Sequence, residues 1–293
     1  MRNLSGIEVL MARKGTAVID VGGGYRSIFG AGVFDRCMEQ GITFDHCYGV
    51  SAGSANLASF LSGQLRRCYR FYTVYSSRKE YASVSNFLTK HTFVDLDYVY
   101  GKLSAHDGEC PLDYQALKAN PALFTVVACK ATDGSTVYFD KSDLAQDNYD
   151  ILKASSTVPV ANKPYMINGV PYLDGGIADP VPVRKAMDEG YERIVLVLTR
   201  QRDILREQKK DVLPARILAR TYPAAGERLM ERYRTYNDEV ALAKQAEKEG
   251  RVLILAPDSL CGLTTLSKSL KGLNAMYDKG YRAAEAIADF LES

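Results

Sequence analysis

Gly49-Val50-Ser51-Ala52-Gly53 lies between an apolar, β-rich run at residues 42–50 and a run of small residues at 52–61 that is typical of a helix. A serine between glycines at a strand-to-helix junction indicates a nucleophile elbow, whose tight, strained turn holds the hydroxyl clear of the chain. Gly49 and Gly53 leave room for such a turn. The following helix directs free N–H groups and its positive dipole end toward the same point. Because glycine is common, the pentapeptide alone is weak evidence for an elbow. Its location between a strand and a helix is the stronger evidence.

A serine hydroxyl becomes a good nucleophile only when a base removes its proton. In the α/β-hydrolase order an acid and then a histidine follow the serine, but all three histidines of this chain lie within the first 106 residues. Asp95 or Asp97 followed by His106 satisfies that order. Residues 86–108, however, look like a polar connection rather than the ends of strands. We therefore expect a carboxylate to act directly on Ser51.

The best candidate for this carboxylate is Asp174, in the stretch Tyr172-Leu173-Asp174-Gly175-Gly176. It follows a short extended run at 165–173 and precedes a proline-rich helix start at 180–182. Gly175 and Gly176 allow the backbone to turn sharply and leave the carboxylate unobstructed. The alternative is an ordinary turn in which Asp174 caps its own backbone. A serine elbow without a suitable histidine favours the catalytic interpretation.

A third motif, a glycine-rich loop at residues 20–27 (DVGGGYRS), follows an expected strand at 16–21. Gly22, Gly23 and Gly24 carry no side chains that would cover the backbone, so their N–H groups can converge on an anion. Arg26 adds a positive charge. Donors of this kind form an oxyanion hole, in which the loss of one donor typically costs about 10²–10³ in rate. The alternative is a simple strand-to-helix turn.

In this order, the three motifs resemble those of the patatin-like phospholipase family of lipid acyl hydrolases, over roughly residues 14–200. The family patterns Gly-Gly-Gly-x-Arg-Gly, Gly-x-Ser-x-Gly and Asp-Gly-Gly match residues 22–26, 49–53 and 174–176. The small residues and proline at 154–159 are similar to the segment that precedes the Asp motif in that family. One departure is Ser27, which stands where the family usually has glycine and bears on the φ angles of the loop.

The resemblance implies a Ser-Asp dyad instead of a triad, with Ser51 as the nucleophile, Asp174 as the base and the loop from Gly22 to Arg26 as the oxyanion hole. It implies hydrolysis of phospholipids or related carboxylic esters, of the phospholipase A or lysophospholipase type. No cofactor and no metal are expected. The implied partners are a lipid or ester substrate and, at most, a membrane surface contacted peripherally.

Two other functions are alternatives. One is a patatin fold kept for regulation or lipid binding, with little turnover. The other is a dinucleotide-binding protein, because Gly22-x-Gly24 after a strand, with Asp45 about 21 residues further on, imitates the Rossmann fingerprint. Ser27 in place of the third glycine argues against the second alternative.

Composition sets broader bounds. With 293 residues, 46% of them hydrophobic, the chain can form one large α/β domain over residues 1–293. A net charge of +2 gives no reason to expect a nucleic-acid partner. Six cysteines without paired or metal-ligand spacing, and an N-terminal segment 1–15 unlike a signal peptide, indicate a cytoplasmic protein with reduced thiols. Apolar runs are too short to cross a bilayer, and nothing indicates an oligomeric state.

Short apolar strands alternate with helices, which predicts a mainly parallel sheet covered on both faces, a three-layer α/β/α fold. Strands are expected at 16–21, 43–50, 193–198 and 251–255, and hairpins at 124–139 and 165–173 around Asp-Gly and Asn-Gly turns. Helices are expected at 30–40, 52–63, 148–156, 183–189, 227–248 and 271–291.

Residues 200–250 are expected to be helical, and the first part, to Arg220, alternates basic with apolar residues. Such a stretch either forms a lid that meets anionic headgroups or is a helix with a solvated basic face. The solvated interpretation is favoured. Tyr233 and Tyr236, further along, either line an acyl pocket or pack against neighbouring helices.

Overall fold

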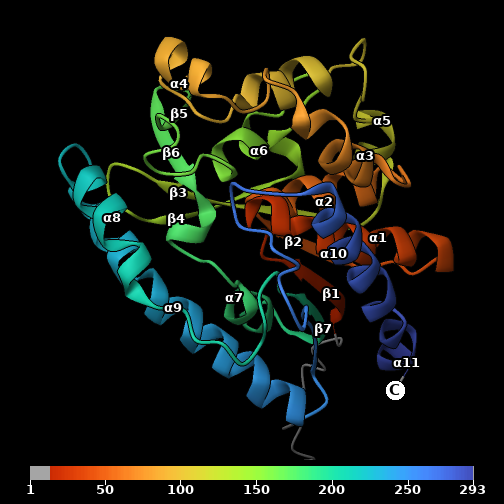
Figure 1. The fold of residues 1–293 in the computed structure, drawn as a ribbon. Helices are drawn as coiled ribbons and strands as arrows, with labels where there is room; N and C mark the ends of the chain where they lie inside the picture. Colours follow the sequence, from red (N-terminus) through yellow and green to blue (C-terminus); the bar gives the residue numbers. More distant parts are fainter. Residues whose placement is uncertain (1–13, 293) are drawn as a thin grey trace, which may run out of the picture.

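The computed structural model describes residues 14–292 (Figure 1). One sheet of eight strands runs through it in the order β5-β6-β3-β2-β1-β7-β8, with β4 paired to β3. The pairs β1–β2, β2–β3, β1–β7 and β7–β8 are parallel, whereas β4, β5 and β6 form antiparallel pairs. The strands are β1 (Lys14–Asp20), β2 (His46–Val50), β3 (Leu123–Lys130), β4 (Thr136–Asp140), β5 (Tyr165–Ile167), β6 (Val170–Asp174), β7 (Tyr191–Val197) and β8 (Val252–Leu255).

Helices connect these strands and cover the sheet. They are α1 (Ile28–Gln40), α2 (Ala52–Leu61), α3 (Arg67–Thr73), α4 (Val84–Lys90), α5 (Tyr114–Ala119), α6 (Asp150–Ser155), α7 (Val183–Asp188), α8 (Val212–Ala219), α9 (Pro223–Lys248), α10 (Leu270–Ala283) and α11 (Ala286–Glu292). A π-helical segment (Asp97–Leu103) and short 3₁₀ turns, including one at Gly24–Ser27, complete the list of helical elements. Figure 1 shows α9 crossing the molecule on the side away from α1 and α10.

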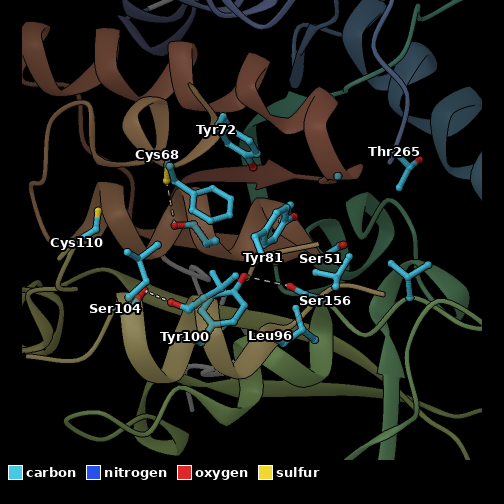
Figure 2. Close-up of a pocket in the computed structure, with 18 of the residues that line it drawn as sticks. Ser51, Cys68, Tyr72, Tyr81, Leu96, Tyr100, Ser104, Cys110, Ser156 and Thr265 are labelled. Carbon is cyan, nitrogen blue, oxygen red and sulfur yellow. Dashed lines mark hydrogen bonds between the residues drawn. The ribbon is translucent and has the colours of Figure 1, made fainter. Parts of the chain in front are cut away.

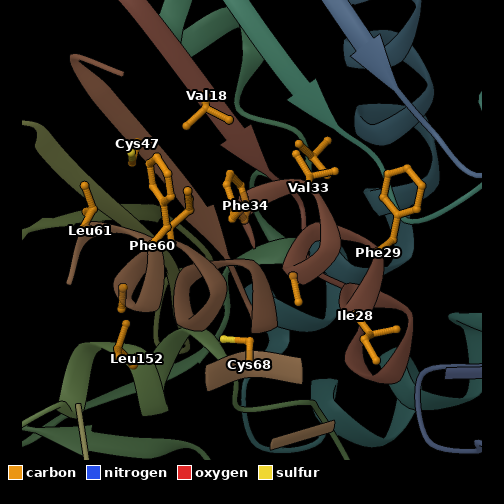
Figure 3. Packing of buried hydrophobic residues seen from close by; sticks show 14 of the residues in the cluster. Val18, Ile28, Phe29, Val33, Phe34, Cys47, Phe60, Leu61, Cys68 and Leu152 are labelled. Carbon is orange, nitrogen blue, oxygen red and sulfur yellow. The ribbon is translucent and has the colours of Figure 1, made fainter. Parts of the chain in front are cut away.

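The alternation of side chains along the strands explains the layers, since successive residues point to opposite faces of a sheet. On one face Val18 packs with the aromatic side chains Phe29, Phe34 and Phe60 of α1 and α2 (Figure 3). This cluster continues into α10, where Met276 is fully buried. The larger of the cores therefore lies between the sheet and these three helices.

On the other face Ala17 and Ile19, the neighbours of Val18, pack with Val183 of α7 and Val240 of α9. Both faces of the central strands are thus buried, as is typical of parallel strands covered by helices on both sides. The predicted three-layer α/β/α architecture with a mainly parallel sheet is confirmed.

Strand register brings the three sequence motifs to one edge of the sheet. Asp20 of β1 pairs with Gly49 of β2, so the glycine-rich loop and the elbow leave neighbouring parallel strands side by side. Further along, Val50 pairs with Val127 of β3, and the next residue of β3, Ala128, pairs with Asp174 of β6. The antiparallel β6 therefore ends level with the elbow.

Two expectations are wrong in detail. The closing helix expected at 271–291 is two helices, because the chain tightens into i→i+3 hydrogen bonds at Glu285 and Ile287. The segment 86–108 is not a polar connection. It includes most of α4 and the whole π-helical segment, and it buries apolar side chains between Val94 and Leu103.

No helix within residues 14–292 combines the length and the apolar character needed to cross a bilayer. The expectation about the N-terminal segment 1–15 falls almost entirely outside the described residues.

Candidate active site

Ser51 occupies a sharp turn between β2 and α2. Its backbone has φ 55° and ψ −132°, a conformation that a non-glycine residue adopts only under strain. A Cβ at position 49 would come within 2.4 Å of the Ser54 Cα, and one at position 53 within 2.2 Å of the Asp20 carbonyl oxygen. The elbow consequently needs both Gly49 and Gly53.

Hydrogen bonds hold this turn from behind. The Ser51 N–H donates to the Ser155 Oγ (2.8 Å), and the Ser155 hydroxyl donates to the Val127 carbonyl (2.6 Å). The Ser54 hydroxyl donates to the Ser51 carbonyl (2.5 Å). Ser155 ends α6 and is fully buried, so the segment 154–159 acts as a support for the elbow.

Asp174 meets Ser51 across this edge of the sheet, 123 positions further along the chain. Its buried carboxylate lies beside the Ser51 side chain, whose interaction lowers the pKa of Asp174, and it accepts the Gly176 N–H at 2.8 Å. Burial raises the pKa of Asp174, while the hydrogen bonds from Ser51 and Gly176 oppose that rise. A Cβ on Gly175 would stand 2.1 Å from the Val127 carbonyl oxygen, so only glycine fits there.

The glycine-rich loop lies beside this pair. Gly22, Gly23 and Gly24 have φ values of 67°, 131° and 61°, all in the region that favours glycine. The Gly22 N–H donates to the Asp20 carboxylate (3.0 Å), whereas the N–H groups of Gly23 and Gly24 have no protein acceptor within the described part of the chain. The loop therefore leaves two amide donors available.

Ser27, the departure from the family pattern, has φ −68° and ψ −6°. These are ordinary helical angles that any L-residue adopts, so glycine is not required at this position. The serine consequently leaves the turn at Gly22–Gly24 unchanged.

Asp20 is a supporting residue that the sequence interpretation did not single out. Its buried carboxylate accepts hydrogen bonds from the Gly22 N–H and the Asn56 side-chain amide (2.8 Å). Burial raises the pKa of Asp20 to about 6 against the effect of these two bonds. The sequence signal was present, since this aspartate begins the stretch DVGGG.

Two cavities meet at Ser51, and both are lined by Gly24, Val158, Thr265 and Leu266 as well. The broader one has a volume of about 620 Å³, and Arg26, Asp174, Arg200, Arg206, Lys210, Asp211, Arg232 and Tyr236 contribute its polar lining. The narrow one has a volume of about 80 Å³ and is mainly apolar. The nucleophile thus lies at the junction of a charged and an apolar space.

Figure 2 shows the narrow cavity extending from Ser51 toward Cys68, Ser104 and Cys110. Its walls come from α2, α3 and the segment around the π-helix; they include Ala55, Phe71, Tyr72, Tyr81, Val94, Leu96, Val99, Tyr100 and Leu103. Arg67 also lines it, but its guanidinium donates to Ser59, Ser104 and the carbonyls of Pro111 and Cys110. Because these donors are already engaged, Arg67 adds little polarity, and the cavity is mainly apolar.

Arg200 and Arg206 of the basic stretch 200–220 line the broad cavity, so the solvated interpretation is wrong for these two residues. Arg206 and Arg232 both bind the Asp211 carboxylate, which is only 4% exposed. Tyr236 lines the same charged cavity and does not line the narrow one. Arg216 and Arg220, in contrast, are exposed as expected.

The three histidines lie elsewhere. His46 contacts Tyr191 and Thr125 within the sheet, His91 follows α4, and His106 pairs with Asp147 at the surface. Within residues 14–292 no histidine lines either cavity at Ser51, and no cluster of His, Cys, Asp and Glu could hold a metal ion.

Asp45 receives two hydrogen bonds from Thr16, near the start of β1. It therefore lies at the opposite end of that strand from Gly22–Gly24. A ribose-binding carboxylate belongs at the carboxyl ends of the strands, so this position argues against the dinucleotide-binding alternative.

Comparisons with known proteins agree with this fold and these motifs. A family model described as patatin-like phospholipase matches residues 21–187, and the chain belongs to this family of lipid acyl hydrolases. A second model, for a domain of unknown function designated DUF6363, matches residues 222–292.

Among individual relatives, YjjU of Escherichia coli (strain K12) is 31% identical over 188 residues, which are 62% of this chain and 51% of YjjU. The match thus spans about half the length of that relative. VipD from Legionella pneumophila has a similar fold, with a TM-score of 0.55 and 13% identity, over 94% of this chain and 67% of the VipD chain.

Proposed function

We propose that this protein is a carboxylic ester hydrolase of the phospholipase A or lysophospholipase type, acting through a Ser51–Asp174 dyad. The observation that carries the proposal is that the Ser51 side chain meets the buried Asp174 carboxylate at the junction of two cavities. Serine without a neighbouring base is inert at neutral pH. Asp174 supplies that base directly.

In the first half of the reaction the Ser51 Oγ attacks the ester carbonyl carbon as its proton passes to Asp174. Negative charge develops on the carbonyl oxygen, and the N–H groups of Gly23 and Gly24 are the available donors for it. Collapse of this intermediate breaks the ester bond. The leaving alcohol takes the proton from Asp174, and the acyl group remains on Ser51.

In the second half Asp174 removes a proton from water, which attacks the acyl carbonyl. The bond to the Ser51 Oγ then breaks, Asp174 returns the proton to that oxygen, and the fatty acid leaves. Burial makes Asp174 a stronger base than an exposed carboxylate, because its pKa is raised. A single carboxylate thus serves both steps without a histidine.

The narrow apolar cavity suits an acyl chain, since aromatic and aliphatic side chains line it from Ser51 inward. At the mouth of the broad cavity Phe87, Val160 and Leu266 are 45%, 42% and 44% exposed, although they are apolar. We propose that these side chains make a peripheral contact with a membrane surface. Sedimentation with phospholipid vesicles tests it: a Phe87→Ser variant that sediments as fully as the native protein would exclude this contact.

Labelling with a fluorophosphonate probe tests the dyad, because the probe reacts only with an activated serine. The native protein is expected to be labelled at Ser51. Ser51→Ala is expected to lose labelling entirely, and Asp174→Asn to lose both labelling and ester hydrolysis by a factor of at least about 10³. Ser142→Ala and Asp188→Asn, which change exposed residues of the same types, serve as matched controls and should behave as the native protein does.

Circular dichroism establishes that each variant is folded. Full hydrolysis by folded Asp174→Asn would refute the dyad. A native protein that is neither labelled nor active on any ester would instead favour the alternative in which a patatin fold is kept for regulation or lipid binding.

A further inference from the structure

The broad cavity beside Ser51 concentrates positive charge. Five basic side chains and two carboxylates contribute to its lining; the basic ones are Arg26, Arg200, Arg206, Lys210 and Arg232. They come from the glycine-rich loop, from the segment after β7 and from α9, so the tertiary fold assembles them from distant parts of the chain.

The two carboxylates offset only part of this charge. Asp211 is shared between Arg206 and Arg232, and Asp174 is engaged with Ser51 and Gly176. Neither Arg26 nor Arg200 has an ionic partner among the described residues.

Arg26 is the most telling of these side chains. It is only 8% exposed, and its Nε has no hydrogen-bond partner. Burial, reinforced by the nearby charge of Arg200, lowers the pKa of Arg26 to about 10. A buried guanidinium without an acceptor, facing other cations, is unfavourable unless an anion binds between them.

We propose that this cavity binds a phosphate-type anion carried by the lipid headgroup, so that the protein hydrolyses net-anionic lysophospholipids and phospholipids in preference to zwitterionic ones. The proposal rests on the proposed function. Arg26 and Arg200 have free donors and bind the phosphate oxygens, because a guanidinium fork matches their geometry. Arg206 and Arg232, held in place by Asp211, add to the positive field.

This arrangement also assigns a role to the C-terminal segment. Arg232, Tyr236, Thr265 and Leu266 line the cavity and fall within residues 222–292, the part that matches DUF6363. The catalytic pair falls within residues 21–187. The C-terminal segment therefore contributes to headgroup recognition beside a dyad supplied by the patatin-like part.

Hydrolysis of two lysophospholipids with the same acyl chain tests the preference. Lysophosphatidic acid and lysophosphatidylcholine are compared as monomers below their micellar concentrations, so that surface charge does not contribute. The native kcat/KM is expected to be about tenfold higher for the anionic lipid, as for a charge-assisted hydrogen bond. Arg200→Gln is expected to bring this ratio close to one, and Arg200→Lys to keep part of the preference for the anionic lipid. Arg216→Gln, an exposed arginine of α8 outside the cavity, is the matched control and should keep the native ratio.

Calorimetric binding to the Ser51→Ala variant separates this inference from the proposed function, because it requires no turnover. Lysophosphatidic acid is expected to bind more tightly than lysophosphatidylcholine, and adding Arg200→Gln should remove the difference. Equal affinities, or a native kinetic ratio near one, would overturn the inference while leaving the dyad intact. Inorganic phosphate that binds as tightly as lysophosphatidic acid would also overturn it, since the site would then take a free anion.

Discussion

Asp174 experiences two opposing influences on its pKa: burial, which favours the neutral acid, and hydrogen bonds, which favour the carboxylate. Burial is the larger, so the net shift is upward. The same residue must be ionised to accept the serine proton. Its environment therefore makes it more basic, but it also becomes protonated at a higher pH than an exposed aspartate does.

A pH profile follows from this sign. Hydrolysis should fall as the pH decreases through the raised pKa of Asp174, so the acid limb of kcat/KM should lie above the ordinary aspartate value of 3.8. His106→Gln, which alters an exposed histidine that lines neither cavity, should leave that limb in place. Either a limb at the ordinary value or one that moves in His106→Gln would contradict a buried aspartate base.

Among the secondary-structure elements, α2 has two roles. Its N-terminal end follows Ser51 and closes the elbow, while Ala52 and Ala55 on the first turns line the narrow cavity. Small residues at these positions keep the space open beside the nucleophile. The opposite wall comes from residues 94–103, which include the π-helical segment.

Filling the narrow cavity should shorten the acyl chain that the protein accepts. Ala55→Leu places a larger apolar side chain there, and it is expected to lower kcat/KM on a long-chain ester about tenfold or more while sparing a butyryl ester. Ala119→Leu, on the exposed end of α5, is the matched control for a leucine added to a helix. Equal losses on both esters would show that the cavity does not hold the acyl chain.

For the molecule as a whole, both family matches contribute strands to the same sheet. Residues 222–292 supply β8, which pairs with β7, as well as α9 and α10, which complete the cores on the two faces. We therefore propose that the chain folds as a single domain in which the part of residues 200–250 that is helical, from 208 to 248, borders the site.

Unfolding in urea tests this proposal. Met276→Ala in α10 removes a fully buried side chain and is expected to lower the free energy of unfolding by about 2–5 kcal/mol. Circular dichroism and amide exchange in α1 and α9 should report one shared transition in the native protein and in the variant. Lys271→Ala, exposed on the same helix, should change little. Separate transitions for the N- and C-terminal parts would show two domains.

Local sequence motifs predict a large part of the fold and of the candidate site. The glycines at 22–24, 49, 53 and 175 mark the turns of the site in the sequence itself. Each lies in a strained turn or a close backbone approach that admits no other residue. Alternating apolar strands and helices likewise indicate the three-layer sheet, because strand periodicity is a local property. Even the absence of a suitable histidine was visible from the order of residues alone.

Tertiary structure alone decided which side chains surround the nucleophile. Leu96 and Tyr100 line the narrow cavity, although the sequence alone led us to expect a polar connection there. Arg200 and Arg232 line the charged cavity because α9 and the end of β7 converge there, whereas Arg216 on the same basic stretch is exposed. Periodicity tells which residues share a face of one element, but a cavity is formed by several elements, and their packing depends on contacts between residues far apart in the chain.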